Sequence, residues 1–182
     1  RADVVRDMLG QIGEKHGVDP LLGLAVANAE SAFNPNAVSS DGHFSKGLFQ
    51  LLDSTAKHIM EKEGMEEEYT PFDPEQNADI GVRYLRYLHD LFNEETELPN
   101  NMITYPAANS SSLEKLAVAA FNAGEGRVAS AQDRAARAGL DPREFENIEG
   151  YLPKTTQEYV QRVMAFKLDE EGATIGQFGD EL

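Results

Sequence analysis

The sequence predicts an all-α fold, on three observations. Apolar residues recur at helical spacing in several separate stretches. Two of these stretches follow the pairs Asp19-Pro20 and Asp73-Pro74, in which Asp caps a helix and Pro takes its first position. No stretch shows the alternation of apolar and polar residues that is typical of a strand. We therefore expect a helical domain over residues 1–168, followed by an acidic flexible tail at 169–182.

The first predicted helix begins near Val4 and ends in the region of Gly13 and Gly17. Its apolar residues fall on one helical face and are Val4, Val5, Met8, Leu9 and Ile12. The second helix begins at Pro20 and is almost entirely apolar as far as Ala29. We expect this second helix to be buried, with the carboxyl group of Glu30 near its C-terminal end.

The carboxyl group of Glu30 is the main candidate for a catalytic group. Burial disfavours an ionised carboxylate, and the negative end of the helix dipole acts in the same direction, so both predict a raised pKa for Glu30. A carboxyl group that stays protonated near neutral pH can serve as a general acid. Composition alone favours a solvated Glu at a helix end instead, because most Glu side chains are exposed.

The stretch after Glu30 predicts a loop, because residues 34–46 are rich in Ser, Asn, Gly and Pro. Loops held by a scaffold often carry binding groups. Residues 47–52 are apolar and short, and they fit either an extended segment or the lead into a helix. A helix capped by Asp53 or Ser54 then runs to about Glu63.

The second half of the chain predicts further helices. A long amphipathic helix runs from Pro74 to about Glu95, and the polar residues 93–112 form an insertion-like loop. Another helix starts at Ser112 and leads into the corner Asn122-Ala123-Gly124. An Ala-rich helix follows at 128–138. The last helix is expected to be capped by Thr155 or Thr156 and to bury Tyr159.

Composition narrows the class of partner. The chain has 32 acidic and 16 basic residues, and a formal net charge of −16 repels nucleic acid and anionic membrane surfaces, whereas a glycan remains compatible. Without Cys there is no disulfide or thiol chemistry. The four His show no metal-ligand spacing, so we predict no metal. The GxGxxA string at 124–129 follows a predicted helix and not a strand, so we predict no cofactor either. The longest apolar run is too short for an integral membrane segment.

The chain begins at Arg1 and shows no signal peptide, so we expect it to be trimmed or cut from a larger protein.

Four short motifs follow one another along the chain. The first is Glu30-Ser31 with Phe33-Asn34-Pro35, Ala37 and Ser39 after it, and the second is Gly47-Leu48-Phe49-Gln50. The third is Ala120-Phe121-Asn122-Ala123-Gly124, and the fourth is residues 153–156 followed by Tyr159-Val160. Together, over residues 19–166, they resemble the lytic transglycosylases with a soluble-lytic-transglycosylase, or goose-lysozyme-like, catalytic domain.

The resemblance implies a lysozyme-like helical domain with a glycan-binding cleft. It implies cleavage of the MurNAc–GlcNAc β-1,4 bond of peptidoglycan without water, which leaves 1,6-anhydro-MurNAc ends. Glu30 would act first as the acid and then as the base. The partner would be peptidoglycan glycan strands in the bacterial periplasm or cell envelope. The chain would then be exported by a signal sequence that it does not itself contain, as a domain of a larger envelope protein.

Residue type and motif position also assign substrate contacts. We expect Ser39 to bond Glu30 or the substrate N-acetyl group, and Gln50 to bond sugar or amide groups. Phe49 and Leu52 are expected to form an apolar wall.

In the later motifs, Asn122 is expected to bond an amide or carbonyl group, with Phe121 and Ala123 beside it. The Tyr159 hydroxyl is expected near Glu30, although Tyr159 fits a core position about equally well.

Two alternatives stay open. Phe121 stands where the resembled family usually has Tyr, and Thr155 stands where it often has Glu, which motivates a weakly active peptidoglycan-binding or assembly module. The other alternative is a hydrolase of the lysozyme type, in which Asp41 activates a water. The separation of the Asp41 and Glu30 carboxyl groups would decide between hydrolase and transglycosylase.

An apparent two-residue insertion lies between Gly42 and Gly47. It adds His43 and Lys46 near Glu30, and we expect both to be solvent-exposed rather than in contact with a peptide carboxylate of the substrate.

Overall fold

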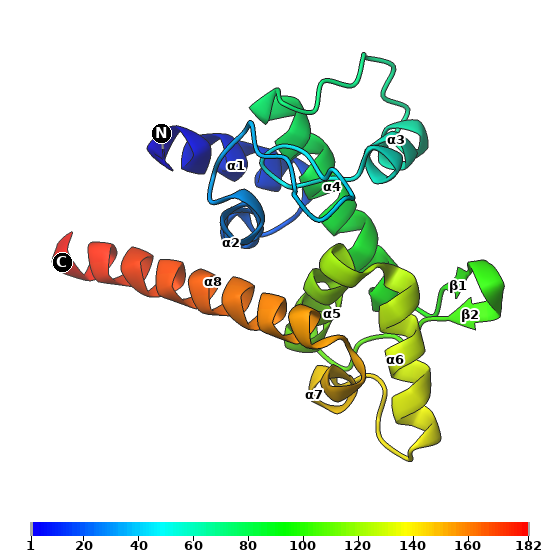
Figure 1. Cartoon of the computed structure of the whole chain (residues 1–182). Helices are drawn as coiled ribbons and strands as arrows, with labels where there is room; N and C mark the ends of the chain where they lie inside the picture. The colour runs from blue at the N-terminus through cyan, green and yellow to red at the C-terminus, as the bar shows by residue number, and fades with distance from the viewer. Residues whose placement is uncertain (1, 182) are drawn as a thin grey trace. The chain divides into compact units, whose positions relative to one another are not determined.

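The chain is mainly helical, as the sequence predicted (Figure 1). The computed structural model describes the backbone of residues 2–181 and the side chains of residues 3–173. Two compact units divide the chain: unit 1 is Arg1–Tyr84 with Val163–Leu182, and unit 2 is Leu85–Arg162. Unit 2 is therefore an insertion in the sequence of unit 1, and each unit is described by itself below.

Unit 1 is built on α1 (Ala2–His16), α2 (Pro20–Ser31), α3 (Asp53–Lys62) and the first part of α4 (Pro74–Asn93). The last part of α8 (Lys154–Glu181) belongs to it as well. Asp19 caps α2 by accepting a hydrogen bond from the Leu21 N–H at 2.9 Å, and Pro20 opens the helix, as predicted. The core of this unit is formed by large apolar side chains that are at most 1% exposed, among them Leu9, Leu22, Leu48, Phe49, Ile59 and Ile80.

Unit 2 contains the end of α4, then α5 (Ser110–Ala123), α6 (Glu125–Arg137), α7 (Phe145–Ile148), η2 (Glu149–Tyr151) and the start of α8. Its core is again apolar and includes Leu85, Leu88, Phe92, Leu116, Val128 and Ile148, none of them exposed. Gln132 is also fully buried and bonds the backbone of Tyr105 in both directions, at 3.1 and 2.9 Å. A third bond from Gln132 reaches the Pro142 carbonyl at 3.2 Å, so one side chain fixes the two loops on either side of α5 and α6.

The structure differs from the sequence prediction within residues 93–112. Instead of a featureless loop, this segment holds a small antiparallel hairpin of β1 (Glu97–Leu98) and β2 (Met102–Ile103), joined by η1 (Pro99–Asn101). Strands of two residues are too short to show an alternating pattern. Thr104 is buried directly after the hairpin, and its hydroxyl group donates toward the Leu91 and Glu94 carbonyls.

Other helix starts also differ from the prediction. α3 begins at Asp53 with Leu52 as its N-cap, so neither Asp53 nor Ser54 caps it. α5 begins two residues before Ser112, because the side chain of Asn109 caps it by accepting from the Ser112 N–H at 2.8 Å. α8 begins at Lys154, so neither Thr155 nor Thr156 is its N-cap.

α8 continues beyond the predicted end of the domain. Its backbone stays helical to Glu181, and Glu170 and Glu171 form ion pairs with Arg6 and Lys167. The predicted flexible tail therefore differs from the structure over residues 169–173. Side chains after 173 lie outside the described residues, so the division at 168 stays a prediction.

Within residues 2–181, no helix combines the length and apolar character needed to cross a bilayer.

Candidate functional site

Glu30 lies in the last turn of α2, as the sequence predicted. Residues 22–27 of this helix are buried, and Glu30 is partly exposed at the point where the helix emerges. The chain leaves the helix through Ala32 and Phe33, which both take positive φ angles of 51° and 65°. The carboxyl group therefore stands at the edge of the unit 1 core, on a rigid element.

Ser31 links the end of α2 to the second motif. Its hydroxyl group donates toward the Leu48 carbonyl at 2.8 Å and also lies 3.2 Å from the Ala27 carbonyl. The link brings the Glu30 turn beside residues 47–52, which are 17 or more positions later in the sequence. Ser31 thus has a structural role in joining two parts of the candidate site.

Residues 46–51 form a tight reversal. The backbones of Lys46 and Leu51 bond each other in both directions, at 3.0 and 3.1 Å, and the Gly47 N–H donates to the Ala37 carbonyl at 2.9 Å. Gln50 takes a φ of 47°, and its amide nitrogen donates to the Ala37 and Gly47 carbonyls. The donor half of this amide is therefore used inside the protein, and its oxygen is the group left to accept a bond from a ligand.

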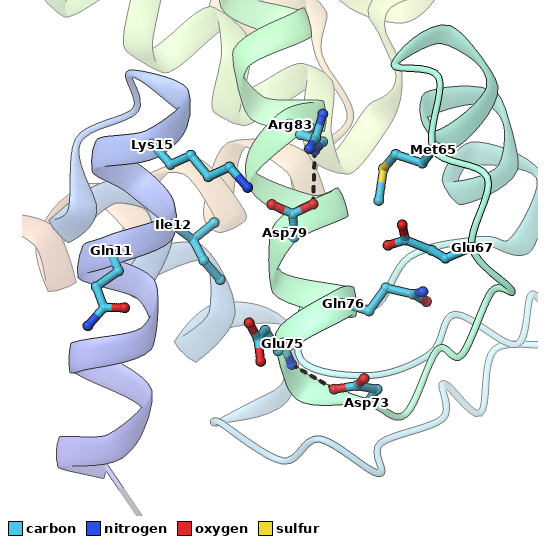
Figure 2. A pocket seen from close by; sticks show the side chains of 10 residues that line it. All are labelled: Gln11, Ile12, Lys15, Met65, Glu67, Asp73, Glu75, Gln76, Asp79 and Arg83. Carbon is cyan, nitrogen blue, oxygen red and sulfur yellow. Dashed lines mark hydrogen bonds and ion pairs between the residues drawn. The ribbon is translucent and has the colours of Figure 1, made fainter.

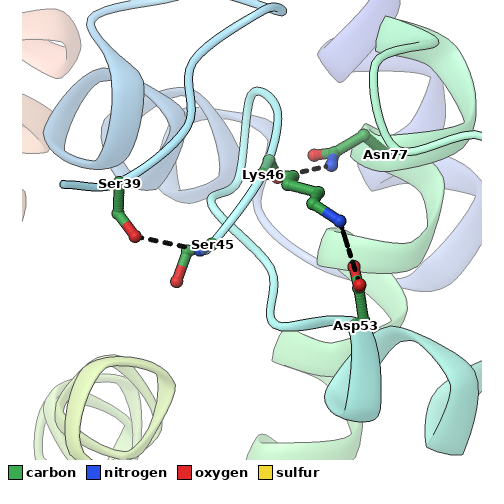
Figure 3. Close-up of polar contacts among 5 residues, drawn as sticks. All are labelled: Ser39, Ser45, Lys46, Asp53 and Asn77. Carbon is green, nitrogen blue, oxygen red and sulfur yellow. Dashed lines mark hydrogen bonds and ion pairs between the residues drawn. The ribbon is translucent and has the colours of Figure 1, made fainter. Parts of the chain in front are cut away.

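The reversal is anchored by Asn77, a residue that the sequence argument did not identify. Asn77 is fully buried on α4 and accepts from the Phe49 N–H at 2.8 Å. Its amide nitrogen donates to the Lys46 carbonyl at 2.9 Å (Figure 3) and to the Pro71 carbonyl at 3.0 Å. The sequence offers one indication of this role, a polar Asn on an otherwise apolar helix face. That indication does not identify the backbone groups that Asn77 binds.

Gly47 is required by this anchor. Its φ is 81°, and a Cβ atom there would lie 2.3 Å from the Asn77 amide nitrogen and 2.4 Å from the Pro71 carbonyl oxygen. The family-like Gly at this position thus lets the backbone approach Asn77 closely.

Lys46 forms an ion pair with Asp53 at 2.9 Å, which Figure 3 shows across the start of α3. Its side chain is 27% exposed, so Lys46 is less exposed than the sequence predicted, whereas His43 is exposed as predicted. The pairing leaves Lys46 a structural role in holding the loop to α3.

Ser39 and Asp41 bond each other inside the loop. The Ser39 hydroxyl donates to Asp41 at 2.8 Å and accepts from the Ser45 N–H at 2.9 Å. Asp41 also accepts from the His43 N–H. The bond from the His43 backbone is the main cause, and the bond from Ser39 the second, that hold the pKa of Asp41 below its usual value. These contacts give Asp41 a structural role in its loop, where its carboxylate bonds Ser39 and the His43 backbone.

The predicted apolar wall is only half present. Phe49 is fully buried and packs against Gly81, where a Cβ atom would lie 2.4 Å from its ring. Phe49 is therefore a core residue, which corrects the expectation of a substrate contact. Leu52 is 39% exposed and is accessible to a ligand.

In unit 2, Asn122 lies at the end of α5, and Thr156 fixes its orientation. The buried Thr156 hydroxyl donates to the Asn122 side-chain oxygen at 2.8 Å. That bond leaves the Asn122 amide nitrogen, on an exposed residue, without a partner among residues 3–173. The amide nitrogen is thus left available as a hydrogen-bond donor. The hydroxyl group of Thr156, for which the sequence predicted a capping role, orients the Asn122 side chain.

The neighbours of Asn122 are mainly structural. Phe121 and Tyr159 are 9% and 2% exposed, so both rings belong to the core of unit 2, and the Arg162 guanidinium lies 5.9 Å from the centre of the Tyr159 ring. Ala123 is partly exposed. Gly124 takes a φ of 91° at the junction of α5 and α6, a backbone conformation that favours glycine.

A separate hollow of about 490 Å³ lies in unit 1 between α1, residues 65–76 and α4, and Figure 2 shows its mixed charged lining. None of the predicted site residues lines it. Burial raises the pKa of Asp79 there, but hydrogen bonds from His16 and Arg83 outweigh burial and hold that pKa below its usual value. Asp79 therefore ties α1 to α4 as an ionised group. No cluster of potential metal ligands occurs in the part of the chain that the structure describes.

Comparison with known proteins identifies the family of this chain. The transglycosylase SLT domain family matches residues 7–141. Membrane-bound lytic murein transglycosylase F of Desulfosudis oleivorans is 33% identical over 148 residues, which is 81% of this chain and 28% of that protein. Membrane-bound lytic murein transglycosylase C of Edwardsiella ictaluri is 34% identical over 70% of this chain and 33% of its own length. The chain thus spans about a third or less of these relatives.

Solved structures agree on the fold. Lytic transglycosylase Slt from Pseudomonas aeruginosa aligns with a TM-score of 0.69 and 27% identity, over 89% of this chain and 23% of that one. The 70 kDa soluble lytic transglycosylase from Escherichia coli aligns with a TM-score of 0.67 and 25% identity, over 88% and 23%. The lysozyme-like helical fold predicted from the sequence is confirmed. With its family match covering most of its length, this chain belongs to the transglycosylase SLT domain family.

Proposed function

We propose that this domain is a peptidoglycan lytic transglycosylase that cleaves the MurNAc–GlcNAc β-1,4 bond and leaves 1,6-anhydro-MurNAc ends. The observation that carries the proposal is the position of Glu30, a partly exposed carboxyl group at the end of a buried helix, tied through Ser31 to the Gln50 segment. Membership of the SLT family and relatives named lytic murein transglycosylases support it.

The chemistry uses one carboxyl group twice. Protonated Glu30 donates its proton to the glycosidic oxygen, which leaves with GlcNAc, while the substrate's own N-acetyl group supports the positive charge that develops at C1. The C6 hydroxyl of MurNAc then forms the new bond to C1, and its proton returns to the Glu30 carboxylate. Every atom and proton is accounted for without water.

The supporting groups follow from the geometry of each unit. The Gln50 oxygen is available to accept from a sugar hydroxyl or an amide N–H, and the Asn122 amide nitrogen is available to donate to a carbonyl. Leu52 supplies accessible apolar surface. Ser39 mainly stabilises its own loop, since its hydroxyl group already donates to Asp41 and accepts from the Ser45 N–H.

Substrate and location follow from the same proposal. Peptidoglycan lies outside the cytoplasmic membrane, so we place the domain in the periplasm or cell envelope, as part of a larger exported protein. The small share of its relatives that this chain spans supports the larger parent.

Digestion of purified sacculi followed by mass spectrometry of the released muropeptides tests the proposal. We expect products that are lighter by one water than the reducing-end species, and loss of release in Glu30→Gln. Glu14→Gln, the same change at an exposed position on α1, is the control and should stay active.

Reducing-end products would instead identify a hydrolase. Binding to sacculi without release, by protein with a helical circular dichroism spectrum, would identify a binding or assembly module.

A further inference from the structure

A second hollow, of about 430 Å³, lies in unit 2 between α6 and the segment 150–153. Arg127, Ser130 and Arg134 line it from α6. These residues are spaced three and four positions apart, so they share one face of the helix. We call this hollow the α6 pocket.

The charge of the α6 pocket is opposite to that of the chain. The formal net charge is −16, yet the pocket is lined by two arginines and no acidic residue. Among residues 3–173, neither Arg127 nor Arg134 has a carboxylate partner at ion-pair distance, whereas Arg137 on the same helix pairs with Asp133 at 2.9 Å. The pocket thus offers cationic groups that the fold does not neutralise.

Arg134 is held in place by an aromatic ring. Its guanidinium lies 5.0 Å from the centre of the Tyr151 ring. Stacking on the ring uses the face of the guanidinium and leaves its edge N–H groups for a ligand. A planar carboxylate matches such an edge with two parallel hydrogen bonds. Ser130 adds a hydroxyl donor between the two arginines.

The dimensions suit a short peptide. Arg127 and Arg134 are seven residues apart on α6, which is about 10 Å along the helix. An extended peptide covers that distance in about three residues. Leu152 and Pro153 provide apolar wall for its backbone.

Arg127 of the pocket is also near the third motif in the sequence. Arg127 is in the first turn of α6, three residues after Gly124 and five after Asn122. The helix that carries the pocket therefore begins directly after the third motif, which links the pocket to the candidate site along the chain.

We propose that the α6 pocket binds carboxylate groups of the peptide that murein strands carry on their muramic acid residues. The inference rests on the proposed function and extends it: the domain reads the peptide as well as the glycan. Arg127 and Arg134 are binding residues in this proposal and take no part in bond cleavage.

Two substrates separate peptide recognition from glycan cleavage: glycan strands that keep their peptides, and the same strands after an amidase has removed them. For the double variant Arg127→Gln with Arg134→Gln, we expect KM on peptide-bearing strands to rise at least tenfold. On stripped strands, KM and kcat should match wild type.

Arg137→Gln is the matched control, since it removes a charge from the same helix at a side chain that is 80% exposed and already paired. It should leave both substrates unaffected. An equal loss on both substrates in the double variant, or no loss on either, overturns the proposal.

Direct binding tests the pocket without catalysis. A labelled tripeptide with two free carboxylates should bind wild type more tightly than its diamide, as measured by fluorescence polarisation, and the double variant should lose the difference. If inorganic phosphate displaces the peptide at equal concentration, the pocket is a general anion site and the proposal fails. If the tripeptide binds but wild type cleaves neither strand, the proposed function fails and peptide recognition stands.

Discussion

Both compact units anchor their loops with a buried amide side chain, but the two anchors act at different places. In unit 1, Asn77 bonds the segment that carries Gln50, so the anchor and the candidate site share one loop. In unit 2, Gln132 bonds residues 105 and 142, and Asn122 is oriented separately by Thr156. A buried amide thus holds the candidate-site loop directly in unit 1, whereas in unit 2 it holds the loops before α5 and after α6.

Charged substitutions at the two buried anchors, Asn77 and Gln132, should have the largest effects. Asn77→Asp and Gln132→Glu each place a carboxylate against two backbone carbonyl groups in a buried site, which should cost about 3–5 kcal/mol at neutral pH. Urea denaturation measures both losses, and each should shrink as the pH falls and the new carboxyl group takes up a proton. Muropeptide release by the fraction that remains folded should fall for Asn77→Asp and persist for Gln132→Glu. Equal loss of activity per folded molecule would contradict the distinction.

Gly47→Ala tests the Asn77 anchor from its other side. The new Cβ would combine a positive φ with contacts of 2.3 and 2.4 Å, so we expect a loss of about 3 kcal/mol in the free energy of unfolding. Gly42→Ala is the control, because its φ is 88° but nothing lies within 4 Å, and it should cost about 1 kcal/mol. Similar losses for the two variants would mean that backbone strain alone, and not close approach, selects glycine at position 47.

Thr156→Val tests whether the Thr156 hydroxyl group positions Asn122 in unit 2. The change keeps the shape of the side chain and removes the hydroxyl group that donates to Asn122, so we expect kcat/KM to fall about tenfold. Thr155→Val, at the exposed neighbour, should have no comparable effect. Kinetics on glycan strands measures both, and unchanged activity in Thr156→Val would show that Asn122 needs no positioning.

The smallest predicted effect is a difference between the two units in how their stability depends on pH. Burial is the main cause that lowers the pKa of His89 in unit 2, while its Nδ1 donates to the Leu85 carbonyl. The unfolded chain therefore takes up a proton first, and stability falls as the pH drops below about 6.5. In unit 1 the lowered pKa of Asp79 affects folding stability at a lower pH. Ionised Asp79 contributes its full stabilisation above the ordinary Asp pKa of about 3.9, and this stabilisation is lost as the pH falls further.

Hydrogen exchange between pH 7 and 5 should thus show α4 residues after Leu85 losing protection before those around Asp79. His89→Gln should remove the early loss, and His58→Gln, at an exposed position, should not. Simultaneous loss along α4 would contradict separate windows.

The sequence was sufficient where a local pattern determines the outcome. Asp19 and Pro20 start α2 as expected, and the apolar run places Glu30 at its end, because capping and periodicity are properties of neighbouring residues. The anchors depend on partners far away. Asn77 meets Phe49 from 28 positions along the chain, and the burial of Phe49 depends on the missing Cβ of Gly81. No local pattern contains such pairings, so the role of Phe49 was predicted wrongly.

The insertion of unit 2 into the sequence of unit 1 has a consequence for synthesis on the ribosome. The first helices of unit 1 take partners from α8: Arg6 pairs with Glu170, 164 residues later, Asp19 with Lys167, and the Phe33 ring packs edge-on against Phe166. Since synthesis adds about 5–20 residues per second, roughly 10 to 30 seconds pass between the synthesis of α1 and α2 and the synthesis of these partners. Unit 2 is complete before they arrive. A nascent chain therefore carries a finished second unit and an unfinished first one, and the earliest helices to be made are the last to acquire all of their partners.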